Sequence, residues 1–311
     1  MLAILTVIAP IFALMAFGFL AVRFRLFPAE GIRGLIAFVN NFATPCLLFH
    51  SLLSSDFSSA FNIAIIGPFY FGALTCFVVG IGIAMRGFGN TPGVAVSVGF
   101  SGMFTNTVLV GLPITQRAYG PEALPVVLSI IGLHGAILLT IGMVTIEVMR
   151  RDGRSLAATL VVAARRVASN PLIWGIAAGL IGYFSGLTLI EPADAFFSLM
   201  SQAVVPVALF GIGGALNEFK LSESWHQALV ASLIKLILHP AIAYVLMVLV
   251  LRVPLETARY GILLAAMPAG INVYVFATYY NRAVNVAANT ILIATIASAV
   301  TISFWLYVLS I

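Results

Sequence analysis

The stretch FSGMFTNTVLVGLPITQRAYG, residues 100–120, places glycine, proline, asparagine and threonine in the middle of an apolar run long enough to cross a membrane. A second run, LLAAMPAGINVYVFATYYNRA at residues 263–283, has the same character. Pro113 removes a backbone donor and clashes with the preceding helical turn, and Gly111 and Gly270 lower the cost of leaving helical geometry. A break at membrane depth persists only where protein covers it or where it lines a cavity. The two runs therefore predict interrupted helices, although simple kinks in packed helices are the alternative.

The two halves of the chain repeat each other. Five positions of the first half recur in the second at one offset of 161 residues: Pro10 as Pro171 (171 − 10 = 161), Gly18 as Gly179, Pro45 as Pro206, Leu48 as Leu209 and Phe49 as Phe210. Hydropathy places five membrane spans in each half, and an odd number makes the second copy insert upside down. We predict an all-α integral membrane protein of ten transmembrane helices, built as two inverted five-helix repeats with broken, crossing helices 4 and 9.

A membrane span needs about 20 apolar residues. The predicted spans lie at about residues 2–22, 31–53, 60–85, 92–119, 122–149, 170–188, 192–217, 225–250, 257–280 and 284–310. The first repeat is expected at residues 1–149, a cytoplasmic linker at 150–169 and the second repeat at 170–311. The first span has no basic flank and no small-residue cleavage site, so we expect a retained helix and not a signal peptide.

Composition and charge also favour a membrane protein. Of the 311 residues, 62% are hydrophobic and 8% are charged, whereas a soluble domain carries about 25% charged residues. The net charge of +5 is attributed to cytoplasmic loops and not to nucleic-acid binding. Eleven Lys and Arg residues fall in five alternate loops and three fall on the opposite side. This asymmetry predicts a multi-pass protein of the plasma (inner) membrane with both termini on the non-cytoplasmic side.

Few ionisable residues lie within the predicted bilayer. Lys235 is near mid-depth in the eighth span, where an unpaired charge is costly and marks function. His239 follows one turn later on the same face, and His134 lies in the fifth span. A snorkelling lysine and hydrogen-bonded histidines are the structural alternatives. No Asp or Glu is expected at mid-depth, so coupling to Na⁺ or H⁺ would use neutral oxygens, and uniport is equally allowed. The candidate neutral oxygens are those of Ser101, Thr105 and Thr107.

Several segments resemble the auxin efflux carrier family, which spans plant auxin exporters and microbial carriers of malate, malonate and similar acids. They are FVNNFATPCLLFH at 38–50, NTVLVGLPI at 106–114, HPAIA at 239–243 and AAMPAGINVYVFATYYN at 265–281. The resemblance implies that helices 1, 2, 6 and 7 form a scaffold and a dimer contact. Helices 3–5 and 8–10 would form a moving transport domain, with helices 4 and 9 crossing at the substrate.

The same resemblance implies a set of substrate-binding residues. Carried onto this chain, they are Thr105, Asn106, Gly111, Pro113, Gly270, Ile271, Asn272, Val273 and Tyr274. Plant carriers have proline where this chain has Thr105 and Val273, and many have a long central loop that this chain lacks. Both departures favour a small carboxylate over auxin. The offset between Asn106 and Asn272 is 166 (272 − 106), so their equivalence is inferred from position and composition.

The sequence thus predicts a secondary active or facilitative transporter of small organic anions, mono- or dicarboxylates such as malonate or malate, working by elevator-type alternating access. The alternatives are an auxin-like aromatic acid carrier, a membrane-embedded small-molecule sensor and a channel. Protease, hydrolase and Walker motifs are absent from the sequence, so we do not expect an enzyme or an ATP-driven pump. We expect no metal site and no cofactor. The expected partners are the lipid bilayer and a second copy of the chain.

Overall fold

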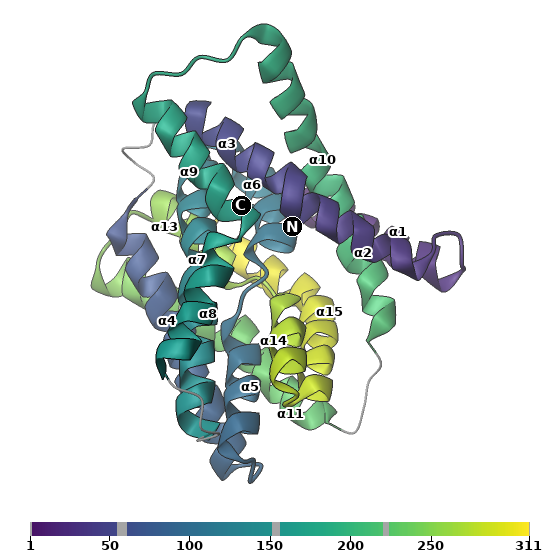
Figure 1. The fold of residues 1–311 in the computed structure, drawn as a ribbon, viewed down its shortest axis with the longest axis vertical. Coiled ribbons are helices and arrows are strands. Elements are labelled where there is room, and N and C mark those ends of the chain that lie inside the picture. Colours follow the sequence, from purple (N-terminus) through teal and green to yellow (C-terminus); the bar gives the residue numbers. More distant parts are fainter. Residues whose placement is uncertain (1, 55–60, 151–155, 220–223, 311) are drawn as a thin grey trace.

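The computed structural model describes residues 2–54, 61–150, 156–219 and 224–310 (Figure 1). The helices are α1 (Leu2–Arg23), α2 (Ala29–Phe38), α3 (Thr44–Ser54), α4 (Ile63–Arg86), α5 (Pro92–Met103), α6 (Leu112–Tyr119), α7 (Leu124–Arg150), α8 (Leu156–Ala168), α9 (Pro171–Phe184), α10 (Glu191–Ala215), α11 (Trp225–Leu233), α12 (His239–Tyr244), α13 (Leu255–Ala265), α14 (Asn272–Tyr280) and α15 (Val284–Val308). Within these ranges there is no strand, only an isolated bridge between Thr105 and Ala269. The all-α prediction is confirmed for the described residues.

Seven helical segments of the described chain are long and apolar enough to cross a membrane. They are Ile4–Arg23, Ala29–Leu53, Ile63–Arg86, Pro121–Met149, Glu191–Glu218, Trp225–Val250 and Val284–Val308. These segments coincide with seven of the predicted spans. Repeated long apolar helices of this kind are the pattern of a multi-pass integral membrane protein.

The other three predicted spans take different forms. The span predicted at 170–188 is α9, whose 14 residues extend about 21 Å, less than a hydrocarbon core of about 30 Å. The spans predicted at 92–119 and 257–280 are each divided, the first into α5 and α6 and the second into α13 and α14. The divisions fall at the clusters of glycine, proline and asparagine, because these residues favour non-helical backbone.

Wider π-helical turns interrupt several helices. They lie at Val39–Ala43, Thr107–Gly111, Ile234–Leu238 and Val245–Val250. The first three end two residues before Pro45, Pro113 and Pro240. Proline has no N–H for the carbonyl four residues earlier, and in each case the residue before the proline donates to the carbonyl five residues back. Such turns are common at functional sites.

The helices pack in two groups. α1 packs along α10 and α3 along α9, while α4 packs along α5 and α11 along α15. In Figure 1 the first set, with α2, gathers in the upper part of the view, and α5, α11, α14 and α15 gather in the lower part. Glycines allow close contact in the upper group: a Cβ at Gly18 would overlap the carbonyl oxygen of Phe210, and a Cβ at Gly179 would lie 3.2 Å from Phe49 Cα. The interrupted segments lie where the two groups meet α7.

Candidate functional site

The two interruptions meet and bond to each other through their backbones. Asn106 N–H donates to Pro268 O at 2.8 Å, and Gly270 N–H donates to Phe104 O at 3.1 Å. These bonds accompany an isolated antiparallel bridge. Lipid cannot hydrogen-bond, so this exchange satisfies groups that the breaks would otherwise leave open. The two interrupted helices therefore meet at a crossing formed by residues 104–106 and 268–270. Gly270 lies in the second break as the sequence predicts, whereas the first break precedes Gly111 and Pro113, which lie in the π-helical turn and in α6.

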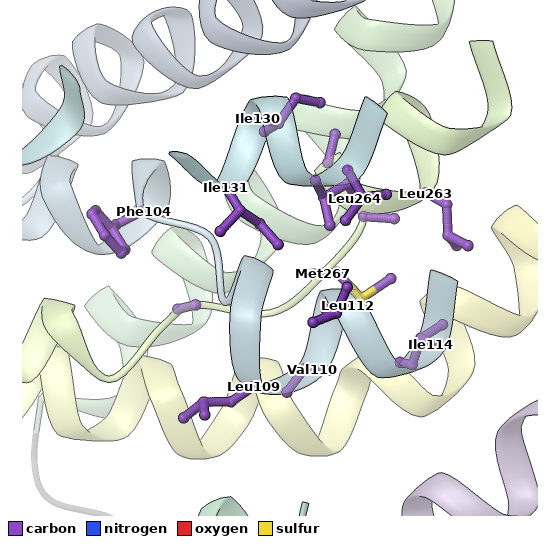
Figure 2. Packing of buried hydrophobic residues seen from close by; sticks show 14 of the residues in the cluster. Phe104, Leu109, Val110, Leu112, Ile114, Ile130, Ile131, Leu263, Leu264 and Met267 are labelled. Carbon is purple, nitrogen blue, oxygen red and sulfur yellow. The ribbon is translucent and has the colours of Figure 1, made fainter. Parts of the chain in front are cut away.

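Small residues make the crossing possible. A Cβ at Gly270 would lie 3.2 Å from Thr105 O, and a Cβ at Gly111 would lie 2.5 Å from Leu264 Cδ1. Figure 2 shows apolar side chains from both segments, including Met267, packed around the crossing. At Gly270 a Cβ would therefore press on the other backbone, whereas at Gly111 it would displace the Leu264 side chain.

His134 of α7 holds the crossing from another side. Thr105 N–H donates to His134 Nε2 at 3.1 Å, and the imidazole is 2% exposed. Because Nε2 accepts this bond, the hydrogen of the neutral ring lies on Nδ1. Within the described residues, Nδ1 is buried without a hydrogen-bond partner. His134 thus anchors the crossing and keeps one donor uncommitted.

A cavity of about 330 Å³ lies beside the crossing. Its wall combines the crossing residues with α7, the π-helical turn after α2 and the beginning of α9. Five asparagines line it: Asn40, Asn41, Asn106, Asn170 and Asn272. With His134 neutral, the described lining residues carry no formal charge. The cavity is therefore polar through amides and backbone, not through ion pairs.

Three helix N-termini end at this cavity. Residues 107–109 begin the helical segment that continues as α6, residues 271–272 begin α14, and residues 170–172 begin α9. The first N–H groups of a helix have no intrahelical partner, and each N-terminus carries about half a positive charge. Together their partial positive charges give the cavity a positive potential without a charged side chain, which suits an anion.

Two polar atoms of residues that line the cavity are buried without a hydrogen-bond partner in the described structure. Asn106 Oδ1 accepts from Leu109 N–H at 3.1 Å, which leaves Asn106 Nδ2 buried and unpartnered in the described structure. Thr105 Oγ1 is likewise buried without a hydrogen-bond partner in the described structure. A buried polar group left without a partner costs about 1–3 kcal/mol. A bound acceptor, such as a carboxylate oxygen, would remove that cost.

The structure places some of the predicted site residues at the cavity and others away from it. Those lining the cavity are Thr105, Asn106, Thr107, His134, Gly270, Ile271 and Asn272. Those outside its wall are Ser101, Gly111, Pro113, Lys235, His239, Val273 and Tyr274. Ser101 Oγ donates to Ser97 O at 2.9 Å, and the Tyr274 ring packs on Phe219 with centroids 5.4 Å apart.

Lys235 supports the second break instead of lining the cavity. Its Nζ donates to Ala265 O at 2.7 Å and to His239 Nδ1 at 3.0 Å, and the side chain is fully buried. His239 Nε2 lies 2.9 Å from Phe69 O, and because a carbonyl only accepts, Nε2 carries the ring hydrogen. Ala265 is the last residue of α13. Lys235 therefore bonds to the negative end of a helix that stops at the crossing.

Three of the five lining asparagines were missed by the sequence analysis: Asn40, Asn41 and Asn170. The first two form a polar pair inside an apolar span, shortly before Pro45. Asn170 precedes Pro171, and its Oδ1 accepts from Leu172 N–H at 3.0 Å, so it is the N-cap of α9. An asparagine followed by proline is a signature of a helix start and was a usable signal.

The sequence profile of the membrane transport protein family matches residues 3–306. The chain therefore belongs to this family, and the resemblance to the auxin efflux carriers is confirmed. It is a multi-pass membrane transporter.

Similar chains carry related descriptions. A protein of Rhizobium meliloti (strain 1021), provisionally named as a malonate transporter, is 27% identical over 308 residues, covering 97% of this chain and 94% of the relative. Auxin efflux carrier component 8 of Arabidopsis thaliana is 24% identical over 331 residues, covering 88% of each chain. An uncharacterized transporter of Methanothermobacter thermautotrophicus (strain Delta H) is 26% identical over 281 residues, covering 87% of each. These relatives are transporters and not enzymes.

We expect Gly270→Ala to destabilise the crossing, because the new Cβ would press on the backbone oxygen of Thr105. Overpacking of this kind costs about 1–3 kcal/mol, so the melting temperature of the purified protein should fall by several degrees. Gly67→Ala in α4 is the matched control, since a Cβ there meets nothing within 4 Å. Equal melting temperatures for the two variants would contradict a need for glycine at the crossing.

His134→Leu should destabilise the protein more than His134→Gln. Leucine leaves the buried Thr105 N–H without an acceptor, at a cost of about 1–3 kcal/mol, whereas the glutamine side-chain oxygen can still accept. Thermal unfolding of both variants, followed by tryptophan fluorescence, measures the difference. If both variants melt at the same temperature, the hydrogen bond to Thr105 does not hold the crossing.

Proposed function

We propose that the protein is a secondary active or facilitative transporter of small organic anions, mono- or dicarboxylates such as malonate or malate. The observation that carries this proposal is the cavity at the crossing, where helix N-termini and uncommitted buried donors meet without a charged lining residue in the described structure. Such an arrangement stabilises a carboxylate, whose oxygens accept several hydrogen bonds. Similarity to the protein provisionally named as a malonate transporter supports the same class of substrate.

An aromatic acid of the auxin type is the second candidate. Similarity to auxin efflux carrier component 8 favours it. Small-molecule sites are usually lined by hydrophobic and aromatic side chains with a few polar groups. Here Phe104 is the one carbocyclic aromatic among the described lining residues, and five asparagines stand beside aliphatic residues such as Val108, Leu109 and Ile131. This composition favours a small, oxygen-rich acid over an indole ring.

The proposed architecture has ten spans in two inverted repeats, with α9 and the two divided helices completing the seven long ones. Reciprocal contacts support it. The offset of 161 residues relates Gly18 to Gly179 and Phe49 to Phe210. Gly18 packs on Phe210, and in exchange Gly179 packs on Phe49. A twofold relation between two copies requires such exchanged pairs. The contacts of α1 with α10 and of α3 with α9 follow the same exchange.

The proposed mechanism is an elevator. Helices 1, 2, 6 and 7 (α1–α3, α9 and α10) would be the scaffold, and helices 3–5 and 8–10 the moving transport domain. The cavity combines Asn40 and Asn170 from the first group with Asn106 and Asn272 from the second. Substrate at a boundary of this kind can be exposed to either side when one group slides past the other. Lys235, bonded to the end of α13, would travel with the crossing and offset part of the anion's charge.

We further propose a plasma (inner) membrane location with both termini outside, on the distribution of basic residues. With this orientation Asn170 lies where the chain enters its sixth span from the cytoplasm, so the cavity belongs to the cytoplasmic half. A homodimer through the scaffold is proposed from the resemblance to the auxin efflux carriers. Uniport and coupling to Na⁺ or H⁺ are both compatible with the neutral oxygens at the crossing.

Asn106→Ala and Asn272→Ala should abolish transport while the protein still assembles. Each removes a group that lines the cavity, and losing a hydrogen bond to a charged ligand costs about 1.5–3 kcal/mol, roughly 10- to 150-fold in affinity. Solid-supported membrane electrophysiology on proteoliposomes, with a panel of carboxylates and with Na⁺ or pH gradients, measures substrate, affinity and coupling. Asn62→Ala, which changes an N-cap of α4 outside the cavity wall, is the matched control.

Counterflow of labelled substrate in the same proteoliposomes distinguishes a carrier from a sensor and from a channel, because only alternating access exchanges substrate across the membrane in this way. Wild-type currents in both asparagine variants would show that the crossing is not part of the binding site.

Lys235→Met should weaken anion affinity and lower thermal stability. Methionine keeps much of the volume but leaves Ala265 O and His239 Nδ1 without their donor in a buried place. Half-saturation of the electrophysiological current and the melting temperature measure the two effects separately. A stability loss with unchanged affinity would make Lys235 a structural residue without an electrostatic role.

A further inference from the structure

Lys235 is buried behind the second break among uncharged partners. Its side chain is 0% exposed, and no Asp or Glu of the described residues forms an ion pair with it. Its Nζ has two acceptors, Ala265 O at 2.7 Å and His239 Nδ1 at 3.0 Å. His239 Nε2 carries the ring hydrogen, because it faces Phe69 O at 2.9 Å, so the imidazole is neutral.

The number of acceptors around Nζ fits an amine and not an ammonium. A neutral amine has two N–H groups, and the described structure offers it two acceptors. An ammonium has three donors and would leave one buried N–H without a partner. A charge buried without a counter-charge is so costly that the group neutralises instead. The structure therefore holds Lys235 as a neutral amine with a free lone pair.

The surrounding elements bring few other groups that titrate. Lys235 lies in the π-helical turn that packs against α4, α5, α11, α12 and α15. α5 and α15 contain no Asp, Glu, Lys, Arg, Cys or His, and His226 is at the start of α11, away from this turn. Cys76 of α4 lies with its Sγ 3.7 Å from a carbonyl oxygen of the turn. His239 of α12 and His134 of α7 lie on either side of one phenylalanine ring, with centroids 4.9 and 5.8 Å from it.

We propose that Lys235 is a proton-binding site of the carrier and that one proton is taken up with each anion. The amine takes the proton on its lone pair when an anion enters the cavity and returns it when the anion leaves. The transported unit is then the anion with one H⁺, and the empty carrier moves with a neutral amine. The inference rests on the proposed transport of organic anions and names H⁺ as its coupling ion.

The proton and the anion affect each other because Lys235 is bonded to the second break. Ala265 is three residues before Pro268, whose oxygen accepts from the N–H of Asn106 in the cavity wall. Three residues span at most about 11 Å. At roughly 10–15 Å and an effective dielectric constant of about 20, opposite charges change a binding constant by about tenfold. By reciprocity, the anion favours the proton by the same factor by which the proton favours the anion.

Nitrogen NMR of protein labelled with ¹⁵N-lysine tests the proton site, because an amine and an ammonium give different Nζ signals. The sequence contains two lysines, Lys220 and Lys235, so Lys220→Arg leaves the Lys235 signal alone. Spectra are recorded in liposomes over a series of pH values, with and without saturating malonate, or lactate if malonate shows no counterflow. The ammonium should form at an about tenfold lower proton concentration when the anion is bound.

Uptake of the same labelled anion into proteoliposomes tests the coupling. Both compartments are kept at about pH 7 or above, where carboxylates are ionised, and equal K⁺ with valinomycin holds the membrane potential at zero. A tenfold proton gradient, acidic outside, should concentrate the anion up to about tenfold in wild type, and not in protein-free liposomes. Cys76→Ala, which removes the neighbouring thiol, is the matched control and should behave as wild type.

Two substitutions of Lys235 should abolish this accumulation from opposite sides. Lys235→Met cannot take a proton, and Lys235→Arg cannot release one, because a guanidinium stays protonated. Any counterflow that either variant retains should no longer respond to the proton gradient. If neither variant assembles, the NMR titration decides, since it keeps Lys235 in place.

Three results would overturn the proton site while leaving anion transport intact. They are the same protonation state of Lys235 with and without the anion at every pH, wild-type counterflow without accumulation driven by the proton gradient, and accumulation that persists in both Lys235 variants. Absence of both counterflow and binding for malonate, lactate and the rest of the carboxylate panel would instead reject the proposed function, and the coupling with it.

Discussion

The rest of this structure depends on the need to satisfy backbone hydrogen bonds where two membrane helices stop at mid-depth. Lipid offers no hydrogen bonds, so each open N–H or C=O must find protein or line a cavity. The paired backbone bonds of Asn106 and Gly270 across the crossing satisfy groups of both interrupted segments at once. His134 and Lys235 then serve one remaining donor and one remaining acceptor, at Thr105 and Ala265. The geometry that satisfies the backbone is also what turns the helix N-termini towards a common cavity.

The existence of two interrupted helices was predictable because glycine and proline disfavour regular helix locally, and Gly270 lies in the second break. The position of the first break was not, because Pro113 lies inside α6 and the chain leaves the helix earlier, at residues 104–106. A lysine in an apolar span is visible without any structure. The partners of these residues were not predictable, since Lys235 bonds to Ala265, thirty residues away. Asn170 was missed for the same reason: its sequence signals a helix cap, and only the packing of α9 against α3 brings that cap to the cavity. The shortness of α9 was hidden as well, because hydropathy continues past its end at Phe184.

Lys235 is a buried basic residue that does not line the cavity. A helix that stops in the membrane leaves a negative end, and α13 stops at Ala265. The Lys235 amine donates to that carbonyl and so satisfies the helix end next to the crossing. Its bonds go to Ala265 O and His239 Nδ1, outside the cavity wall, so it does not compete for the ligand. Substitutions at Lys235 therefore act first on the break.

In the proposed elevator, the transport domain must slide back empty after it releases its substrate. The charge of the lining groups affects the energy of this return step. A lining lysine or arginine would make the loaded cavity nearly neutral and the empty one charged, and moving a bare charge past lipid is costly. Return of the empty carrier would then be slow, and exchange of one anion for another would dominate. Under the proposed mechanism, a wall of amides and helix ends would leave the empty cavity without a formally charged lining residue, so its return would not need a second anion to neutralise one. Net transport would then be energetically open, and the membrane potential would act more strongly on the form loaded with an anion.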